Sequence, residues 1–399
     1  MKKVLLTLVG TLLALSCLSA QAGNDKADIK VMTQNQYLGA DLGPIISAMT
    51  NEEYAAAVAS VLQSIAANNF QERALALAES IADRQPHLVA LQEVYAFECL
   101  DFGSGTCATF HGAFNDHLTL TTDALASYGA DYYVAADIQN LTIPTQFMKD
   151  MGLPGLPVFL QGIEGPAMFI RVIDRDVILA RGDVATIPVS MNCPRPESDG
   201  SGCNYVNIGR VMSPLAGPLP AERGFVAVDA WVKGAEYRFI NTHLETRFPS
   251  DDPMSPGLQA AQATELNLAI LFTPPNPGSR LIVAGDINSA PVHEPVGPLV
   301  PPYQQFANGW TIFGEPAFAP MTDTWLLRPG KPAGLTCCEA ADLLNAPSEH
   351  YERIDVVFAR PAPAKVKANV MDADTTDKTA SGLWPSDHAS VITELTYQP

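Results

Sequence analysis

Basic residues are scarce in this chain of 399 residues, which has 24 lysines and arginines against 43 aspartates and glutamates and a formal net charge of −19. A field of this sign repels polyanions, so it argues against the tight, non-specific DNA binding that basic patches provide. A local basic groove stays compatible with these numbers. The acidity does not exclude phosphate chemistry, because bound metal ions reverse the sign of the local charge.

Long apolar runs are missing after the start of the chain. Two lysines, an apolar stretch over residues 4–18 and a small-x-small sequence at 20–22 are typical of an export signal cleaved before Gly23. The stretch is broken by small and polar residues and is shorter than the roughly 20 residues of a spanning helix. We therefore expect residues 1–22 to be a signal peptide and the protein to be secreted or periplasmic. A lipid on Cys17 is an alternative that its flanking residues disfavour.

Repeats, heptads and low-complexity tracts are absent from the sequence, which excludes solenoid and coiled-coil architectures. After the expected signal, the sequence indicates one domain over residues 23–399 with no transmembrane segment and no evident protein partner. Three stretches rich in proline, glycine and small polar residues look like insertions. They cover residues 95–166, 188–220 and 295–344.

Two of the cysteine pairs indicate disulfides. Cys99 and Cys107, and likewise Cys193 and Cys203, are close in sequence and lie in stretches that can fold back on themselves. Because exported thiols are oxidised, we expect both pairs to be bonded.

The remaining cysteines are less informative. Cys337 and Cys338 are adjacent, and a bond between neighbours closes a strained ring, so their pairing is left open. A zinc site is disfavoured, because the sequence has neither a Cys-x-x-Cys pair nor a histidine cluster.

Short apolar runs alternate with helical stretches along the chain, which indicates an α/β protein rich in central strands. Helices are expected between residues 53 and 81 and over 258–272, where the apolar spacing is helical. The expected strands lie at 29–35, 87–94, 175–181, 224–232, 237–244, 280–288, 353–360 and 390–395.

Polar residues end or interrupt most of these apolar runs. Each alone could be a turn former, a cap or a surface group. Together they would be costly in a buried sheet unless they gather around a metal or a phosphate, and ligands in α/β sheets do gather at strand ends. The residues are Asn35, Glu93, His243, Asp286, Asn288, Asp355, Asp387 and His388.

In content and order these motifs resemble the signature of the endonuclease/exonuclease/phosphatase superfamily. They read TQNQY, LQEV, NTHL, GDIN, RID and SDH, and they span residues 31–395 with the insertions unmatched. GDIN alone would be weak, whereas six motifs in order are specific. One departure is His87, where the family commonly has aspartate. The resemblance implies an α/β (α+β) fold, a four-layer α/β/β/α sandwich of two packed mixed sheets flanked by helices.

The resemblance also implies a metal site and a metal-dependent phosphoesterase. Glu93 is the expected Mg²⁺ ligand, with Mn²⁺ or Ca²⁺ as alternatives, and Asn35 completes the site through its amide oxygen. Asp387 either binds the metal or holds the loop. One or two metal ions are both compatible with the sequence.

The other residues are expected to act on the phosphate. Asp286 orients or deprotonates the attacking water, and Asn288 helps to position it. His388 forms a dyad with Asp355, whose carboxylate fixes the imidazole tautomer and favours its cation. His243 donates to a phosphoryl oxygen.

The substrate stays open among a few classes. A phosphodiester in nucleic acid is the first expectation, because the superfamily includes deoxyribonuclease I. A phospholipid head group is the alternative, as in bacterial neutral sphingomyelinases, and apolar residues at 147–160 could touch lipid or cover the core. A non-catalytic binding protein on the same fold would lack one of the site residues, and all are present.

Overall fold

The computed structural model describes residues 27–160, 162–197, 202–214, 217–247, 254–312, 315–330 and 332–398. The expected signal peptide lies outside these ranges. Within them, no helix combines the length and the apolar character that crossing a membrane requires.

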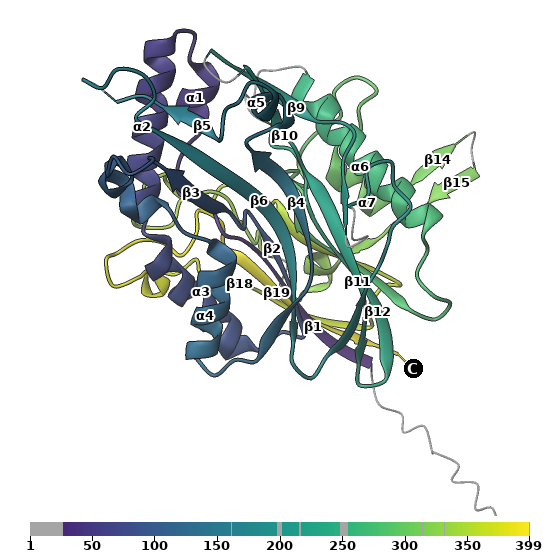
Figure 1. Cartoon of the computed structure of the whole chain (residues 1–399). Helices are drawn as coiled ribbons and strands as arrows, with labels where there is room; N and C mark the ends of the chain where they lie inside the picture. Colours follow the sequence, from purple (N-terminus) through teal and green to yellow (C-terminus); the bar gives the residue numbers. More distant parts are fainter. Residues whose placement is uncertain are drawn as a thin grey trace, which may run out of the picture.

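Two mixed β-sheets form the centre of the molecule (Figure 1). In the first, the strand order is β18-β19-β1-β2-β6-β3, and β4 and β5 also pair with β6. The β1–β2 pair is parallel and the other pairs are antiparallel. Its strands are β1 (Ala27–Asn35), β2 (Leu88–Gln92), β3 (Ala96–Leu100), β4 (Tyr132–Ile143), β5 (Leu156–Val158), β6 (Met168–Arg181), β18 (Lys365–Met371) and β19 (Ser390–Tyr397).

The second sheet has the order β16-β17-β13-β12-β11-β7, and β8 also pairs with β11. Only β12 and β13 run parallel among its described pairs. Its strands are β7 (Ala185–Pro188), β8 (Gly202–Asn204), β11 (Gly224–Val232), β12 (Ala235–His243), β13 (Arg280–Asp286), β16 (Thr322–Asp323) and β17 (Asp355–Arg360). Two small hairpins pair β9 (Gly209–Ser213) with β10 (Gly217–Ala221) and β14 (Trp310–Ile312) with β15 (Glu315–Phe318).

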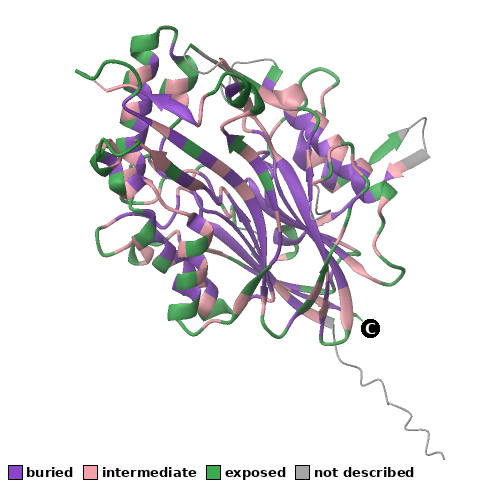
Figure 2. Cartoon of the chain, viewed as in Figure 1, coloured by how far each residue is buried: buried purple, intermediate pink, exposed green. Residues whose placement is uncertain are grey.

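Helices cover the outer faces of both sheets (Figures 1 and 2). Helix α2 begins where the sequence provides a cap, because Thr50 and Glu53 form a capping box. The α-helices are α1 (Gly43–Ser47), α2 (Asn51–Ala67), α3 (Phe70–Arg84), α4 (His117–Ser127), α5 (Gln146–Asp150), α6 (Met254–Phe272) and α7 (Pro302–Asn308). Short 3₁₀ helices are η1 (Thr106–Ala113), η2 (Thr324–Leu327) and η3 (Thr375–Asp377).

Strand β2 shows how the layers form. Leu88 and Ala90 point into the core between the two sheets, whereas Val89 and Leu91 pack against α3 and α4. All four are fully buried, because successive side chains on a strand point to opposite faces and both faces are covered here. On the far side α6 packs on the second sheet. The order helix, sheet, sheet, helix confirms the predicted four-layer sandwich.

Disulfides tie three loops, in agreement with the two predicted pairs. Cys99 is bonded to Cys107, and Cys193 to Cys203. The adjacent Cys337 and Cys338, whose pairing the sequence left open, are bonded as well.

The stretches that look like insertions in the sequence contain regular structure. Residues 95–166 supply β3, β4 and β5, all of which pair with β6 in the first sheet. Residues 188–220 supply β8 and the β9–β10 hairpin, and residues 295–344 supply α7 and the β14–β15 hairpin. The first of these stretches is therefore an integral part of the sheet.

Candidate active site

Five polar residues meet at one end of the paired strands. In the second sheet, His243 on β12 pairs with Asp286 on β13, which pairs in turn with Asp355 on β17. In the first sheet, β1 ends at Asn35 and the neighbouring β2 ends one residue before Glu93. The Asn35 Nδ2 atom donates to Glu93 Oε1 at 3.2 Å and to Asp286 Oδ2 at 3.2 Å. Asn35 thus joins the ends of the two sheets.

Gly285 makes the close approach of β13 to β12 possible. A Cβ atom at this position would lie 1.9 Å from the Thr242 carbonyl oxygen, and the backbone has φ +152°. Only glycine fits this space, so the GD pair brings Asp286 to its place in the row.

Glu93 is held by backbone and side-chain donors. Its Oε2 accepts the Leu38 N–H at 2.9 Å, while Asn35 Oδ1 accepts the Tyr37 N–H at 2.9 Å. Glu93 itself has φ +55°, a left-handed conformation that is strained for a non-glycine residue and that recurs at functional sites. The turn after β2 therefore presents this carboxylate at the site.

His243 is neutral and carries its proton on Nε2. Burial, with the Arg223 guanidinium and His388 nearby, holds the pKa of His243 well below its ordinary value. Arg223 Nη1 lies 3.1 Å from His243 Nδ1, and because a guanidinium can only donate, Nδ1 accepts this bond. The Nε2–H group therefore faces the Asp286 Oδ2 atom at 3.5 Å, while Asn288 Nδ2 donates to the Leu244 carbonyl oxygen at 2.9 Å.

His388 and Asp355 form a buried pair. His388 Nδ1 lies 2.9 Å from Asp355 Oδ2, and His388 Nε2 lies 3.8 Å from Asp286 Oδ2. Burial lowers the pKa of His388, but the carboxylates of Asp355, Asp387 and Asp286 outweigh it and hold the pKa well above its usual range. The imidazole is therefore a cation whose Nε2–H is directed to the site.

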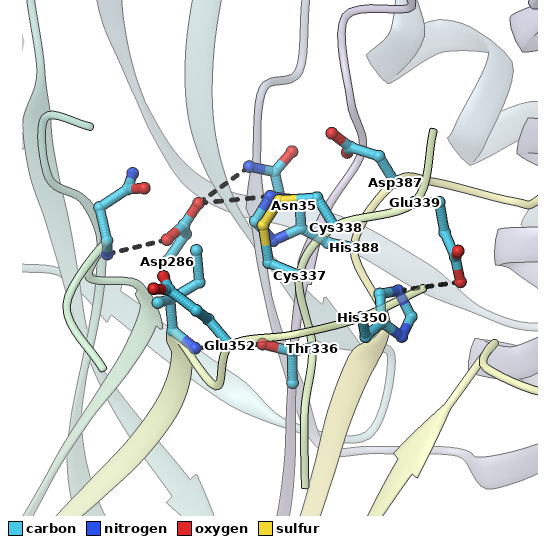
Figure 3. The surroundings of a disulfide bond; sticks show 12 residues. Asn35, Asp286, Thr336, Cys337, Cys338, Glu339, His350, Glu352, Asp387 and His388 are labelled. Carbon is cyan, nitrogen blue, oxygen red and sulfur yellow. Dashed lines mark hydrogen bonds and ion pairs between the residues drawn. A yellow bond between two sulfur atoms is a disulfide. The ribbon is translucent and has the colours of Figure 1, made fainter. Parts of the chain in front are cut away.

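Asp286 interacts with Asn35 and with His388, as Figure 3 shows. Burial, and next the charge of Asp355, raise the pKa of Asp286 to about 7. Its Oδ1 accepts the Asn288 N–H at 2.9 Å, which fixes the turn after β13. The Asp286 carboxylate thus contacts the groups from both sheets.

Asp387 is not hydrogen-bonded to the other predicted metal ligands within the described residues. It lines the same cavity as Glu93. Its backbone carbonyl accepts the Glu339 N–H at 2.9 Å, so the loop that carries His388 is anchored there. Burial is the main cause that raises the pKa of Asp387 to about 7.

Several residues at the site escaped the sequence reasoning. Arg223 lies between His243, Asp174 and Glu245, with Nη1 3.6 Å from Asp174 Oδ2 and Nη2 3.5 Å from Glu245 Oε1. A lone arginine before a buried strand and an aspartate inside another give no motif, so only the folded chain brings them together.

The Cys337–Cys338 disulfide also lies at the site, beside His388 (Figure 3). A sulfur atom of each cysteine and a nitrogen atom of His388 lie within 4.8 Å of one another. Cys337 also forms a backbone bridge with His388. This loop therefore forms part of the wall next to the imidazole.

The donor set suits a hard divalent cation. The site gathers carboxylate and amide oxygens, which Mg²⁺ prefers. Asn35 Oδ1 has a second lone pair beyond the one that accepts the Tyr37 N–H. Asp355 Oδ1 is buried and has no hydrogen-bond partner in the described part of the chain. Ligand atoms of Asp286, Asp355 and His388 lie within 4.8 Å of one another, a grouping that differs from the predicted metal set.

One cavity of about 870 Å³ opens over most of these groups, and Asn35 and Asp355 lie behind its lining. Glu93, Asp286, Asn288, His243 and His388 all line it. Its size is in the range of small-molecule sites, about 300–1,000 Å³.

No protein-family model matches the chain, and no curated protein matches it. Solved structures do match. An endonuclease/exonuclease/phosphatase from Beutenbergia cavernae is 18% identical with a TM-score of 0.46, the match covering 93% of this chain and 72% of that one. A family protein from Leptotrichia buccalis is 14% identical with a TM-score of 0.48, over 92% and 99% of the two chains.

The human Nocturnin catalytic domain with bound sulfate is 16% identical with a TM-score of 0.46, over 92% of this chain and 94% of that one. Identities and TM-scores at this level do not assign an activity to the chain. Its activity is therefore inferred from the side chains of the site. In structure the chain is similar to endonuclease/exonuclease/phosphatase family proteins, the family that its motifs resemble.

Proposed function

We propose that this protein is a divalent-metal-dependent phosphoesterase that hydrolyses a phosphodiester. The observation that supports it is the row of His243, Asp286 and Asp355 across three paired strands, joined through Asn35 to Glu93 on the other sheet. Phosphoryl transfer needs positioning and charge stabilisation more than covalent chemistry. A buried cluster of oxygen donors beside a cationic and a neutral imidazole supplies both.

Glu93 and Asn35 are proposed to hold the metal, with Asp387 as a further candidate ligand or an anchor of the loop. A bound Mg²⁺ would neutralise negative charge on the phosphoryl oxygens and relieve the repulsion among the buried carboxylates. Arrangements with one or two ions are both compatible with the donors present.

The two imidazoles are proposed to bind the phosphate from different sides of Asp286. His388, held at Nδ1 by Asp355 and charged, donates its Nε2–H to a phosphoryl oxygen. His243, neutral, donates its Nε2–H to a second oxygen, and Arg223 fixes the tautomer. Donors that are in place before the reaction lower the barrier because they need no reorganisation.

Asp286 is proposed to orient the attacking water and to take its proton. Its carboxylate lies between His243 Nε2 and His388 Nε2, the two groups that would hold the phosphate. Asn288 supports this arrangement by donating its backbone N–H to Asp286 Oδ1. Proton transfer by a positioned side chain contributes about 10²- to 10⁴-fold to a rate.

The protein is proposed to act outside the cytoplasm. The disulfides Cys99–Cys107 and Cys193–Cys203 support this, because such bonds persist in oxidising compartments. The expected signal peptide points the same way.

The test is a substrate panel of DNA, RNA, sphingomyelin and bis-p-nitrophenyl phosphate, each with Mg²⁺ and with EDTA. We expect hydrolysis of at least the chromogenic diester with Mg²⁺ and its loss in EDTA. Equal rates in both conditions would contradict metal dependence. Binding without turnover of any ester would favour a non-catalytic protein on this fold.

A further inference from the structure

The cavity over the active site continues into a second, apolar part. We define the apolar arm by six of its residues: Leu42, Ile46, Val61, Ile65, Ile143 and Val172. They come from α1 and its N-cap, from α2, and from β4 and β6. In Figure 1 these helices and the β5, β9 and β10 segments gather at one end of the first sheet.

Strand β6 links the apolar arm to the catalytic groups. Ile170, Val172 and Asp174 all line the cavity, and alternate residues on a strand point to the same face. Four residues of strand cover about 13 Å. Asp174 then meets Arg223, which contacts His243. A ligand could therefore extend from the phosphate site along β6 into the arm.

The described walls of the arm consist mainly of hydrocarbon side chains. The side chains that α1, α2, β3, β4 and β5 contribute to the cavity lining are all hydrocarbon. A hydrocarbon lining of this kind favours apolar ligands. Leu42 and Ile46 are 37% and 38% exposed and mark its opening to solvent.

Charge disfavours a polynucleotide in the cavity. Two arginines, Arg223 and Arg247, and nine carboxylate side chains line it. Arg223 is already engaged by Asp174 and Glu245. The many phosphates of a polynucleotide would be repelled by this acidic lining. An ester with a hydrocarbon chain brings only one negative group, which binds at the metal site.

We propose that the apolar arm binds a hydrocarbon chain of the substrate, so that the ester cleaved here is a phosphodiester with a long alkyl or acyl chain. The identity of the reacting group rests on the proposed function, while the arm is tested by binding alone. Of the residues at 147–160 that could touch lipid, Leu156 lines the cavity, Met148 and Val158 are buried in the core, and Phe147 and Met151 are exposed.

The binding experiment uses n-alkyl phosphates from ethyl to decyl, below their micelle concentrations, titrated calorimetrically into the mature protein with Mg²⁺. Burial of a methylene is worth enough to tighten binding by roughly two- to fourfold, so we expect the dissociation constant to fall at each step until the arm is filled. The heat-capacity change should become more negative with chain length. Equal affinities for ethyl and decyl phosphate would overturn the proposal.

Two variants locate the effect in the arm. Ile46→Asp places a charge at the partly exposed opening, and Val61→Phe fills the interior from α2. Both should flatten the dependence on chain length while leaving hydrolysis of ethyl p-nitrophenyl phosphate unchanged. The control is Leu271→Asp on α6, an exposed apolar residue outside the cavity, which should keep the wild-type dependence.

A parallel assay with ethyl and octyl p-nitrophenyl phosphate separates the two claims. Chain-dependent binding without hydrolysis of either ester would support the arm and contradict the proposed function. Hydrolysis with no preference for octyl, and no effect of Ile46→Asp on binding, would support the function and overturn the arm. Faster cleavage of DNA than of any alkyl ester, with Ile46→Asp without effect, would also overturn it.

Discussion

Glu93 is the side chain on which the proposed metal site depends most. It is the acid that follows β2, and both of its oxygens accept hydrogen bonds from groups on or after β1. Glutamine has the same shape but no charge, and its single acceptor oxygen can keep only one of these two bonds, so the variant loses attraction for the cation at the cost of one hydrogen bond. The Glu93→Gln variant therefore tests the charge of this side chain with little change in its shape.

For Glu93→Gln, we expect the Mg²⁺ concentration at half-maximal activity to rise by at least about tenfold, since changes in a metal site typically cost about 10- to 100-fold in affinity. The measurement is a Mg²⁺ titration of diester hydrolysis. Glu98→Gln, which neutralises an exposed acid on β3, is the matched control and should behave as the wild type. An unchanged Mg²⁺ requirement in Glu93→Gln would place the metal elsewhere.

The His388–Asp355 pair should act as one unit. Because Asp355 accepts from Nδ1 and favours the cation, His388→Ala should lower kcat/KM by about 10²- to 10⁴-fold, and Asp355→Asn should lower it substantially. The double variant should be little worse than His388→Ala alone, because losses from groups that share a step are not additive. Circular dichroism should show an intact fold in all three. Multiplied losses, or full activity of either single variant, would refute the dyad.

At the scale of elements, Gly285 sets the spacing of β12 and β13. For Gly285→Ala we expect a loss of about 3 kcal/mol or more in the free energy of unfolding, because the new Cβ meets the Thr242 carbonyl. The control is Gly278→Ala, where φ is also positive but no atom lies within 4 Å. It should lose only about 1 kcal/mol. Equal losses in urea denaturation would mean that the close approach is not the cause.

Asp372 couples β18, α3 and β19, and it predicts how stability depends on pH. It is buried and accepts hydrogen bonds from Ser80 and Ser390, yet burial raises its pKa to about 6. The folded state therefore binds this proton more tightly than the unfolded state, and stability falls as the pH rises from about 4 through 6. Asp372→Asn has no ionisable group here, so it removes this fall in stability with rising pH. We expect a higher Tm than wild type at pH 8 and an equal Tm at pH 4.

Asp374→Asn gives a contrast of opposite sign. The Thr376 N–H group, bound at the helix cap, lowers the pKa of Asp374, so its contribution is present at neutral pH and is lost on acidification. We expect Asp374→Asn to have a lower Tm than the wild type at pH 8. A Tm above that of the wild type for Asp374→Asn, or below it for Asp372→Asn, at this pH would contradict these assignments.

The strands that could be predicted from the sequence are those in which nearly all residues are buried. Strand β11 has the predicted bounds, because nearly all of its residues are apolar and enclosed by two layers. Strand β18 escaped prediction because exposed polar residues alternate with its buried ones, and β4 because two register shifts break its pattern. The first half of β6, where buried residues alternate with partly exposed ones, also escaped prediction. Edge strands that face solvent give a weaker pattern than enclosed ones.

At the site, the motif residues and the pairing of His388 with Asp355 could be predicted, but the contacts from residues outside the motifs could not. The strand-end positions of Asn35, Glu93 and Asp286 follow from the apolar runs before them. The tautomer of His243 depends on Arg223, which is 20 residues away and joins through the β11–β12 pairing. Such contacts depend on strand register, which the short motifs alone do not reveal.

For the whole molecule, the site exists only where the two sheets meet. Besides Asn35, the buried Asn241 on β12 joins the sheets, donating to the carbonyls of Leu91 at 2.8 Å and Val177 at 2.9 Å. Gln92 donates to Asn241 Oδ1 at 2.7 Å. Polar groups buried in this way must be satisfied, so they fix how the sheets align and thereby bring Asp286 and Glu93 to the same Asn35 amide.

The central claim is that these strand ends form one hydrolytic site, and Asp286 at their centre tests it most directly. The measurement is kcat/KM for bis-p-nitrophenyl phosphate with saturating Mg²⁺, compared between wild type and Asp286→Asn. We predict a fall of about 10²- to 10⁴-fold, with circular dichroism and Tm showing a folded protein, because the variant cannot take the proton of the attacking water. Activity of the folded variant within a few-fold of wild type would contradict the account.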